Sequence, residues 1–266
     1  MEAALTRLID RLDSPVLSMT DVIRWGSPVP SFGDLENSTV ATLGLNPSNR
    51  EFVDESGNEL QGVSRRFPTL TSLGLASWSD VDARHMRAIL QSCRTYFDGN
   101  PYDRWFRKLD QIVSGTTASY YHPANKACHL DLIPYATARR WTDLPTRQRT
   151  ALLTIAADVL GLLLRDSPVR ILILNGNTVV EQFQKLAGVV LDRQEMPAWS
   201  LLRRSTADVT GFAYRGVVGK FSGTELGRSI LVLGFNHNLQ SSFGVTTRVI
   251  CAIRDWITED ASDAIQ

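Results

Sequence analysis

The chain has 266 residues, and its 28 basic and 28 acidic side chains cancel to a formal net charge of zero. That balance removes the strongest composition argument for a nucleic-acid or membrane partner. Hydrophobic residues make up 43% and charged residues 21%, which excludes a disordered chain and predicts a globular protein with a sizeable core. Of the 28 basic residues 24 are Arg, which fits either an Arg-rich codon usage or a need for forked phosphate donors.

The cysteine content and the apolar segments bear on the cellular compartment. Three scattered cysteines are too few for a disulfide framework or a four-thiolate metal site. The first residues, MEAALTRLIDRLD, predict a short amphipathic helix and lack the apolar core of a signal peptide. The most hydrophobic stretch, Ala151 to Leu164, is interrupted by polar residues and is shorter than the ~20 residues that span a bilayer. We therefore expect a cytoplasmic protein with no membrane partner.

Apolar runs and helical periodicity alternate along the chain. Buried parallel strands are predicted at Thr39–Leu45, Cys128–Ile133, Arg170–Leu174 and Ile230–Phe235. Helices are predicted at Asp80–Phe97, Pro101–Val113, Pro145–Arg165, Thr178–Leu186 and Thr246–Glu259. The alternation predicts an α/β fold, a three-layer α/β/α sandwich around a central, mainly parallel four-stranded sheet. The segment Thr210–Phe221 alternates as a small hairpin would, at an edge of the sheet.

No repeat or linker divides the chain, so we expect a single domain over residues 1–266. Within it, residues 1–38 form an N-terminal helical extension and residues 39–258 form the core. Ligands of an open parallel sheet bind beyond the carboxyl ends of its strands. Asn46, Asp131 and Asn175 stand at three of these ends, and a polar run over 236–240 follows the fourth. Glycine-rich phosphate loops are absent from the sequence, so we expect no cofactor, and we expect no metal.

Four short motifs follow one another in order. They are Gly44-Leu45-Asn46-Pro47-Ser48, the strand His129–Pro134 with Asp131, the strand Ile171–Gly176 with Asn175, and the segment Leu233–Ser242 with His237. Together they resemble the motifs of the uracil-DNA glycosylase superfamily over about residues 39–250. The resemblance implies a monofunctional DNA glycosylase, a monomer that flips one nucleotide out of double-stranded DNA and hydrolyses its N-glycosidic bond to leave an abasic site.

The resemblance assigns catalytic roles to two of these residues. The carbonyl of Asn46 would orient a water toward the anomeric carbon, although Asn before Pro is also a common turn former. His237 would donate a hydrogen bond to the pyrimidine carbonyl as charge develops on the departing base, and its alternative is a loop histidine. Gly44 and Asn175 would belong to the base pocket.

Base stacking and base extrusion are assigned to other segments. Phe67 is expected to stack on the extruded base, and its alternative is a core residue; Tyr120 or Tyr121 could also supply a ring. The loop that enters the minor groove consists of Asn238, Leu239, Gln240, Ser241 and Ser242. Leu239 is the expected wedge, and Phe243 is the expected core residue beside it.

Asp131 departs from the superfamily pattern, which commonly has Asn at this place. An ionised Asp only accepts hydrogen bonds, so it suits the exocyclic amine of cytosine and repels the carbonyl of uracil. The alternative is a structural Asp that binds a backbone amide. Ser48 is small where several uracil enzymes carry Tyr, which leaves room for a ring substituent. These departures resemble the anti-phage branch of the superfamily, and they imply a modified cytosine such as α-glucosyl-5-hydroxymethylcytosine of phage DNA.

Arginines follow the predicted strand ends and are expected to contact phosphates. They are Arg50, Arg65, Arg66, Arg139 and Arg140, and Arg203 and Arg204 of the polar segment before the expected hairpin are expected to join them. Some of these arginines are expected to pair with Asp or Glu instead. Other functions remain open from the sequence. A uracil-DNA glycosylase of base-excision repair is the first alternative, and a nucleoside hydrolase or a noncatalytic DNA-binding module is the next.

Overall fold

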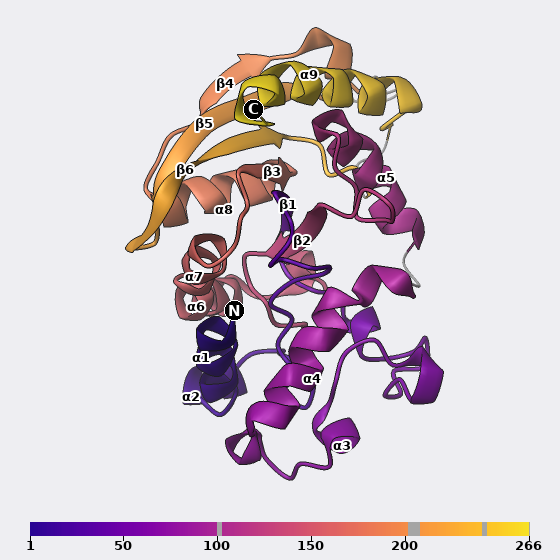
Figure 1. Ribbon diagram of the computed structural model, residues 1–266, viewed down its shortest axis with the longest axis vertical. Helices are drawn as coiled ribbons and strands as arrows, with labels where there is room; N and C mark the ends of the chain where they lie inside the picture. Colours follow the sequence, from indigo (N-terminus) through magenta and orange to yellow (C-terminus); the bar gives the residue numbers. More distant parts are fainter. Residues whose placement is uncertain (100–102, 202–207, 241–243, 266) are drawn as a thin grey trace.

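Six strands form one mixed sheet in the part of the chain that the structure describes, with helices on both faces (Figure 1). This computed structural model describes residues 1–99, 103–201, 208–240 and 244–265. The strand order is β2-β1-β3-β6-β5-β4, in which β2, β1, β3 and β6 are parallel and β5 and β4 are antiparallel. The strands are β1 (Val40–Gly44), β2 (Ala127–Asp131), β3 (Ile171–Asn175), β4 (Asp192–Glu195), β5 (Phe212–Phe221) and β6 (Thr224–Phe235).

The expected four-stranded sheet is wrong in its number of strands. The four predicted parallel strands form, but β6 begins earlier than expected and turns back antiparallel to β5. The segment Thr210–Phe221 is also not a hairpin by itself, because β5 is one long strand whose hairpin partner is β6. Alternating burial is shared by a short hairpin and a long strand, so the pattern could not separate them. Strand β4 is made of four exposed polar residues and carries no apolar signal.

Every predicted helix forms, but one of them is divided in two and the last runs six residues further than predicted. They are α1 (Glu2–Leu12), α2 (Pro15–Ser18), α3 (Leu70–Leu73), α4 (Ala83–Arg94), α5 (Asp103–Val113), α6 (Thr146–Ala156), α7 (Val159–Arg165), α8 (Asn177–Ala187) and α9 (Thr247–Ile265). The single helix expected at Pro145–Arg165 is divided into α6 and α7. The two helices meet at Asp158, whose carboxylate accepts hydrogen bonds from Arg7 and Arg11 of α1 at 2.8 Å. Short 3₁₀ turns that matter below are η1 (Asn49–Glu51), η4 (Tyr96–Asp98) and η7 (Pro197–Trp199).

The sheet separates two hydrophobic cores, which makes the three layers of the expected sandwich. One core packs α1, α6, α7 and α8 against one face, and the other packs α5 and α9 against the opposite face (Figure 1). Strand β3 shows the division, since Leu172 and Leu174 enter the first core while Ile171 and Ile173 enter the second. Both faces of the parallel strands are therefore buried, as the continuous apolar runs predict.

Strand register brings the polar strand ends together. Gly44 at the end of β1 pairs with Asp131 at the end of β2. Asn175 at the end of β3 pairs with Phe235 at the end of β6. Residues far apart in the sequence therefore meet at one edge of the sheet. Among the helices described, none is both long and apolar enough to cross a lipid bilayer.

Candidate active site

A cavity of about 350 Å³ lies at the carboxyl ends of the parallel strands. Each of the four sequence motifs contributes to its wall. The contributing residues are Gly44, Asn46 and Ser48 after β1, Asp131 at the end of β2, Asn175 at the end of β3, and Asn238 after β6. The cavity therefore stands where an open parallel sheet binds its ligands.

The side-chain amide of Asn46 has a fixed orientation. Thr137 Oγ1 donates to the carbonyl of Arg139 at 2.7 Å, so it is left as an acceptor for Asn46 Nδ2 at 3.0 Å. The same Nδ2 also donates to the carbonyl of Pro47 at 3.0 Å. Both amide hydrogens are thus committed, and the group that Asn46 offers to the cavity is its acceptor oxygen Oδ1.

Asp131 ends a buried chain of polar side chains that sequence reasoning missed. Its side chain is almost inaccessible, and His129 Nε2 lies 3.5 Å from Asp131 Oδ1. On the other side of the ring, His129 Nδ1 is 2.7 Å from Thr42 Oγ1, which is 2.6 Å from the Tyr120 hydroxyl. Residues two apart on one strand face the same way, which is the signal that pairs His129 with Asp131.

Gly44 provides room for this pair. A Cβ atom at position 44 would stand 2.5 Å from Asp131 Oδ1 and 2.9 Å from His129 Nε2. Any larger residue would therefore push the carboxylate and the imidazole apart. The role of Gly44 in the cavity is to admit the side chains of the neighbouring strand.

Asn175 holds the loop that follows β6 by hydrogen bonds. Its Nδ2 donates to Gln240 Oε1 at 3.0 Å, and its Oδ1 accepts from the Leu239 backbone N–H at 3.4 Å. Gln240 Nε2 in turn donates to the carbonyl of Trp105 on α5 at 3.3 Å. Asn175 lines the cavity as expected, with its amide engaged by the loop.

Two expected residues of the β6 loop do not reach the cavity. His237 is 2% exposed, and its Nε2 donates to the carbonyl of Trp199 at 2.8 Å. Burial lowers its pKa, so the ring is neutral, and it is absent from the cavity wall. Leu239 is 1% exposed and packs in the second core, so in this conformation it is not a wedge. Asn238 takes the place at the wall that His237 was expected to hold.

Phe67 also lies behind the cavity and not in it. Its ring is buried and stacks on Tyr96 at 5.4 Å between centroids, with the planes 15° apart. Tyr120 is buried and stacks on Phe97. The aromatic rings that line the cavity are Phe32, Trp105, Phe106 and Trp141. Each comes from a segment outside the four motifs, which is why the motif order gave no indication of them.

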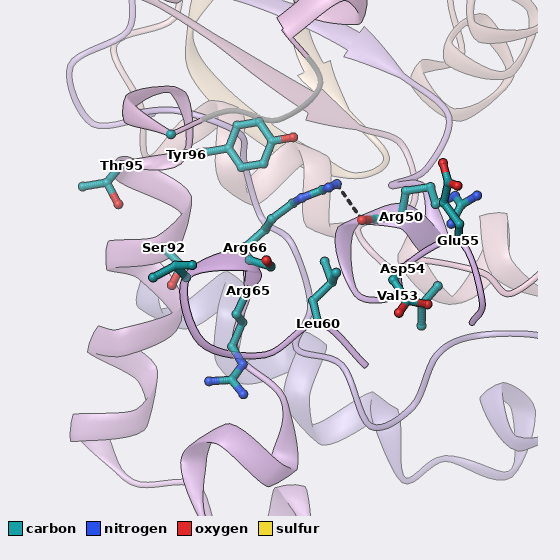
Figure 2. A pocket seen from close by; sticks show the side chains of 13 residues that line it. Arg50, Val53, Asp54, Glu55, Leu60, Arg65, Arg66, Ser92, Thr95 and Tyr96 are labelled. Atoms are coloured by element: carbon teal, nitrogen blue, oxygen red, sulfur yellow. Dashed lines mark hydrogen bonds between the residues drawn. The ribbon is translucent and has the colours of Figure 1, made fainter. Parts of the chain in front are cut away.

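The expected phosphate-binding arginines divide into two groups. Arg139 and Arg140 line the cavity, but Arg139 forms an ion pair with Asp21, which holds the pKa of that carboxyl below its usual value. Arg65 and Arg66 line a second, larger hollow of about 770 Å³ (Figure 2). Arg50 lines both. Arg203, Arg204, Ser241, Ser242 and Phe243 lie outside the described residues.

Ser48 and Glu51 belong to one local turn. Ser48 Oγ accepts from the Arg50 backbone N–H at 3.2 Å and so caps η1, which returns the chain to the cavity at Glu51. Glu51 is buried, the Tyr96 hydroxyl lies 3.1 and 3.2 Å from its two carboxyl oxygens, and Arg66 lies 3.6 Å away. Burial raises the pKa of Glu51 to about 7.

Sequence reasoning missed Glu51 because a single Glu in a polar segment looks like any surface acid. The signal that could have found it is the Ser at the cap of a tight turn directly after the first motif.

Within the described part of the chain, no three His, Cys, Asp or Glu side chains gather as a metal site would require. No protein-family model matches the chain, and comparison with curated proteins likewise gives no match.

Proposed function

We propose that this protein is a monofunctional DNA glycosylase that removes a modified cytosine from a nucleotide flipped out of double-stranded DNA. One observation carries the proposal: a single cavity at the strand ends combines the fixed acceptor oxygen of Asn46 with the buried carboxylate of Asp131. The first would hold the attacking water, and the second would read the base.

The size and lining of the cavity suit one base. Its volume of about 350 Å³ lies near the lower end of the ~300–1,000 Å³ of ligand pockets. Phe32, Trp105 and Phe106 supply aromatic surface for a flat ring. A base paired within a duplex cannot enter such a site, so the nucleotide has to be extruded first.

Asp131 favours cytosine over uracil. An ionised carboxylate accepts hydrogen bonds from the exocyclic amine of cytosine, whereas it repels the carbonyl that uracil has at that place. Small Ser48 at the wall leaves room for a substituent on the ring. A glucosylated 5-hydroxymethylcytosine, as in phage DNA, is the modified cytosine that we favour, because an enzyme acting on ordinary cytosine would damage its own genome.

Asn46 would act by positioning. Its Oδ1 accepts a hydrogen bond from water, which directs the water lone pair at C1′ of the sugar. The C1′–N1 bond breaks with its electrons left on the base, the water oxygen bonds to C1′, one proton passes from the water to the base in the overall reaction, and an abasic site remains. Because an amide is a poor base, the contribution comes from orientation and not from proton abstraction.

Cationic side chains beside the cavity would hold the DNA backbone. Arg140 is exposed at the wall, and Arg50 lines the cavity as well. Forked guanidinium groups suit phosphates, so a locally positive rim is available to a chain whose total charge is zero.

A panel of duplex oligonucleotides tests the proposal. Each duplex carries uracil, 5-hydroxymethylcytosine or its glucosylated form at one position, and alkali cleaves the strand at any abasic site. We expect strand breaks with a modified cytosine. Asn46→Ala should slow single-turnover release on the order of 10²-fold with binding retained, while Asn37→Ala, an exposed Asn outside the cavity, should not.

The remaining outcomes decide among the alternatives. Strand breaks at uracil alone would assign the protein to uracil removal and overturn the cytosine specificity. Base release from free nucleosides but not from DNA would make it a nucleoside hydrolase. DNA binding without release from any duplex would make it a noncatalytic binding module.

A further inference from the structure

Glu51 lies between the cavity and the second hollow. Glu51 lines the cavity, while its partners Tyr96 and Arg66 line the hollow. In Figure 2, Arg66 reaches the backbone carbonyl of Arg50, and the hydroxyl end of Tyr96 points the same way. Glu51 thus contacts the cavity and is also shielded from bulk solvent.

A hydrogen bond from the Tyr96 hydroxyl and an ion pair with Arg66 hold the carboxyl group of Glu51 in place, and together they lower its pKa by less than burial raises it. The Tyr96 hydroxyl spans both carboxyl oxygens at 3.1 and 3.2 Å, and the nearest Arg66 nitrogen is 3.6 Å away. Asp131 on β2 acts on Glu51 as a like charge. Both carboxyl groups line the same cavity, and a like charge nearby favours the protonated form of Glu51.

Removal of a cytosine needs a proton donor. When C1′–N1 breaks, the bonding electrons stay on the base, and a neutral base leaves only if a proton reaches it. Asp131 is assigned to the exocyclic amine and Asn46 to the water, and the amide of Asn46 is no acid. The ring of His237 is hydrogen-bonded to the Trp199 carbonyl and does not reach the cavity. Glu51 is the remaining acid at the cavity wall with a protonated form stabilised by burial.

We propose that Glu51 is the general acid of the reaction and protonates the cytosine ring at N3 as the base departs. The inference rests on the proposed glycosylase function. The O–H bond of Glu51 breaks and N3–H forms, C1′–N1 breaks, and the base leaves neutral. Water bonds to C1′, and the proton that it loses restores the Glu51 acid. The sum is hydrolysis with no other reactant.

Several other ionisable groups face the cavity beside Glu51. Besides Asp131, Tyr96 and Arg66, the groups that line the cavity with it are His129, Arg50, Arg139 and Arg140. The arginines keep their charge over the assay range, so the reaction should follow the acid form of Glu51. Burial places its pKa at about 7, and the rate should fall about tenfold per pH unit above that value.

Single-turnover release from a modified-cytosine duplex between pH 5 and 9 tests the role. Glu51→Gln keeps the shape but holds no transferable proton, so the rate should fall ~10²–10⁴-fold and lose its decline above pH 7. Glu55→Gln removes the same charge from an exposed residue of the same loop and should leave the profile unchanged. The decrease in rate caused by Glu51→Gln should be smaller on a 5-fluorocytosine duplex, because that base leaves more readily.

A second variant separates catalysis from folding. The Tyr96 hydroxyl lowers the pKa of Glu51, so Tyr96→Phe should shift the decline of the rate to higher pH. A purely structural role of Glu51 predicts no such shift. Difference infrared spectra provide a readout without substrate: the wild type should lose a protonated carboxyl band near pH 7 that Glu51→Gln lacks.

The outcomes distinguish this inference from the function on which it rests. An active wild type with the same rate and pH profile in Glu51→Gln overturns the general acid and leaves the glycosylase in place. A wild type that is inert on every duplex overturns the glycosylase and the proposed step together, even if the infrared band is present.

Discussion

Asn46 and Thr137 are joined by a hydrogen bond whose direction is settled by a third group. Because the Thr137 hydroxyl donates to the Arg139 carbonyl, it receives the Asn46 amide hydrogen, and Oδ1 of Asn46 is left for the cavity. The residues are far apart in the sequence, one after β1 and the other after β2. The relationship turns an ordinary Asn-Pro strand end into an oriented acceptor.

Thr137→Val should therefore impair turnover without removing a residue of the first motif. Without the hydroxyl the Asn46 amide can rotate. The single-turnover rate should then fall about tenfold, which corresponds to the free energy of one ordinary side-chain hydrogen bond. Single-turnover rates and DNA affinity, measured together, would show a slower reaction at unchanged binding. Thr142→Val on the exposed turn after Arg140 is the matched control. Equal rates in both variants would contradict the orienting role.

Gly44→Ala should destabilise the protein and abolish release. The new Cβ would meet Asp131 Oδ1 and His129 Nε2, and overpacking of this kind costs ~1–3 kcal/mol. Thermal denaturation measures the loss. Gly99→Ala is the control, because a Cβ at Gly99 meets nothing within 4 Å. A Gly44→Ala protein with wild-type melting temperature would argue against the close packing of this pair.

Asp131→Asn should move the specificity toward uracil. The amide offers a donor as well as an acceptor, which matches the imide edge of uracil. Release of modified cytosine should fall about 10- to 100-fold, the equivalent of the ~1–3 kcal/mol of one base contact, while uracil release rises. The oligonucleotide panel measures both, with Asp143→Asn on an exposed turn as control. An unaltered ratio would make Asp131 structural.

Arg139 and Arg140 should differ in their contribution to DNA binding, although they are neighbours. Arg139 is paired with Asp21, whereas Arg140 is exposed at the cavity wall. Arg140→Ala should lower the salt dependence of binding by ~0.9 in log K against log salt for one lost phosphate contact, and Arg139→Ala should lower it less. Arg165→Ala, near the opposite ends of the strands, is the control. A larger change from Arg139→Ala than from Arg140→Ala would contradict this ranking.

Glu51 should make the stability of the protein depend on pH. Its pKa rises on folding from 4.5 to about 7, so its favourable contribution is complete below pH 4.5 and is lost as pH rises toward 7. Relative to Glu51→Gln, the wild type should lose up to about 3 kcal/mol over that range, at 1.36 kcal/mol per pKa unit. Urea denaturation of both proteins at several pH values measures the difference, and parallel curves would contradict the buried acid.

The strand ends illustrate what local pattern predicts well. Asn46, Asp131 and Asn175 follow buried apolar runs, and parallel pairing brings such ends to one edge whatever the details of the helices. The number of strands was harder to predict from the sequence, because β4 is exposed and polar and the burial pattern of β5 alternates as that of a hairpin would. Hydrophobic periodicity reports burial, and it does not report which partner a strand finds.

His237 and Glu51 show most clearly what the sequence predicts and what only the tertiary structure determines. The motif order predicted a polar loop after β6 and a polar turn after β1, and apolar patterning determined where both segments lie. Only the packing decided that His237 binds the Trp199 carbonyl while Glu51 lines the cavity and accepts a hydrogen bond from Tyr96. The physical reason is that side-chain direction and desolvation depend on contacts between segments distant in sequence, which periodicity along one segment does not contain.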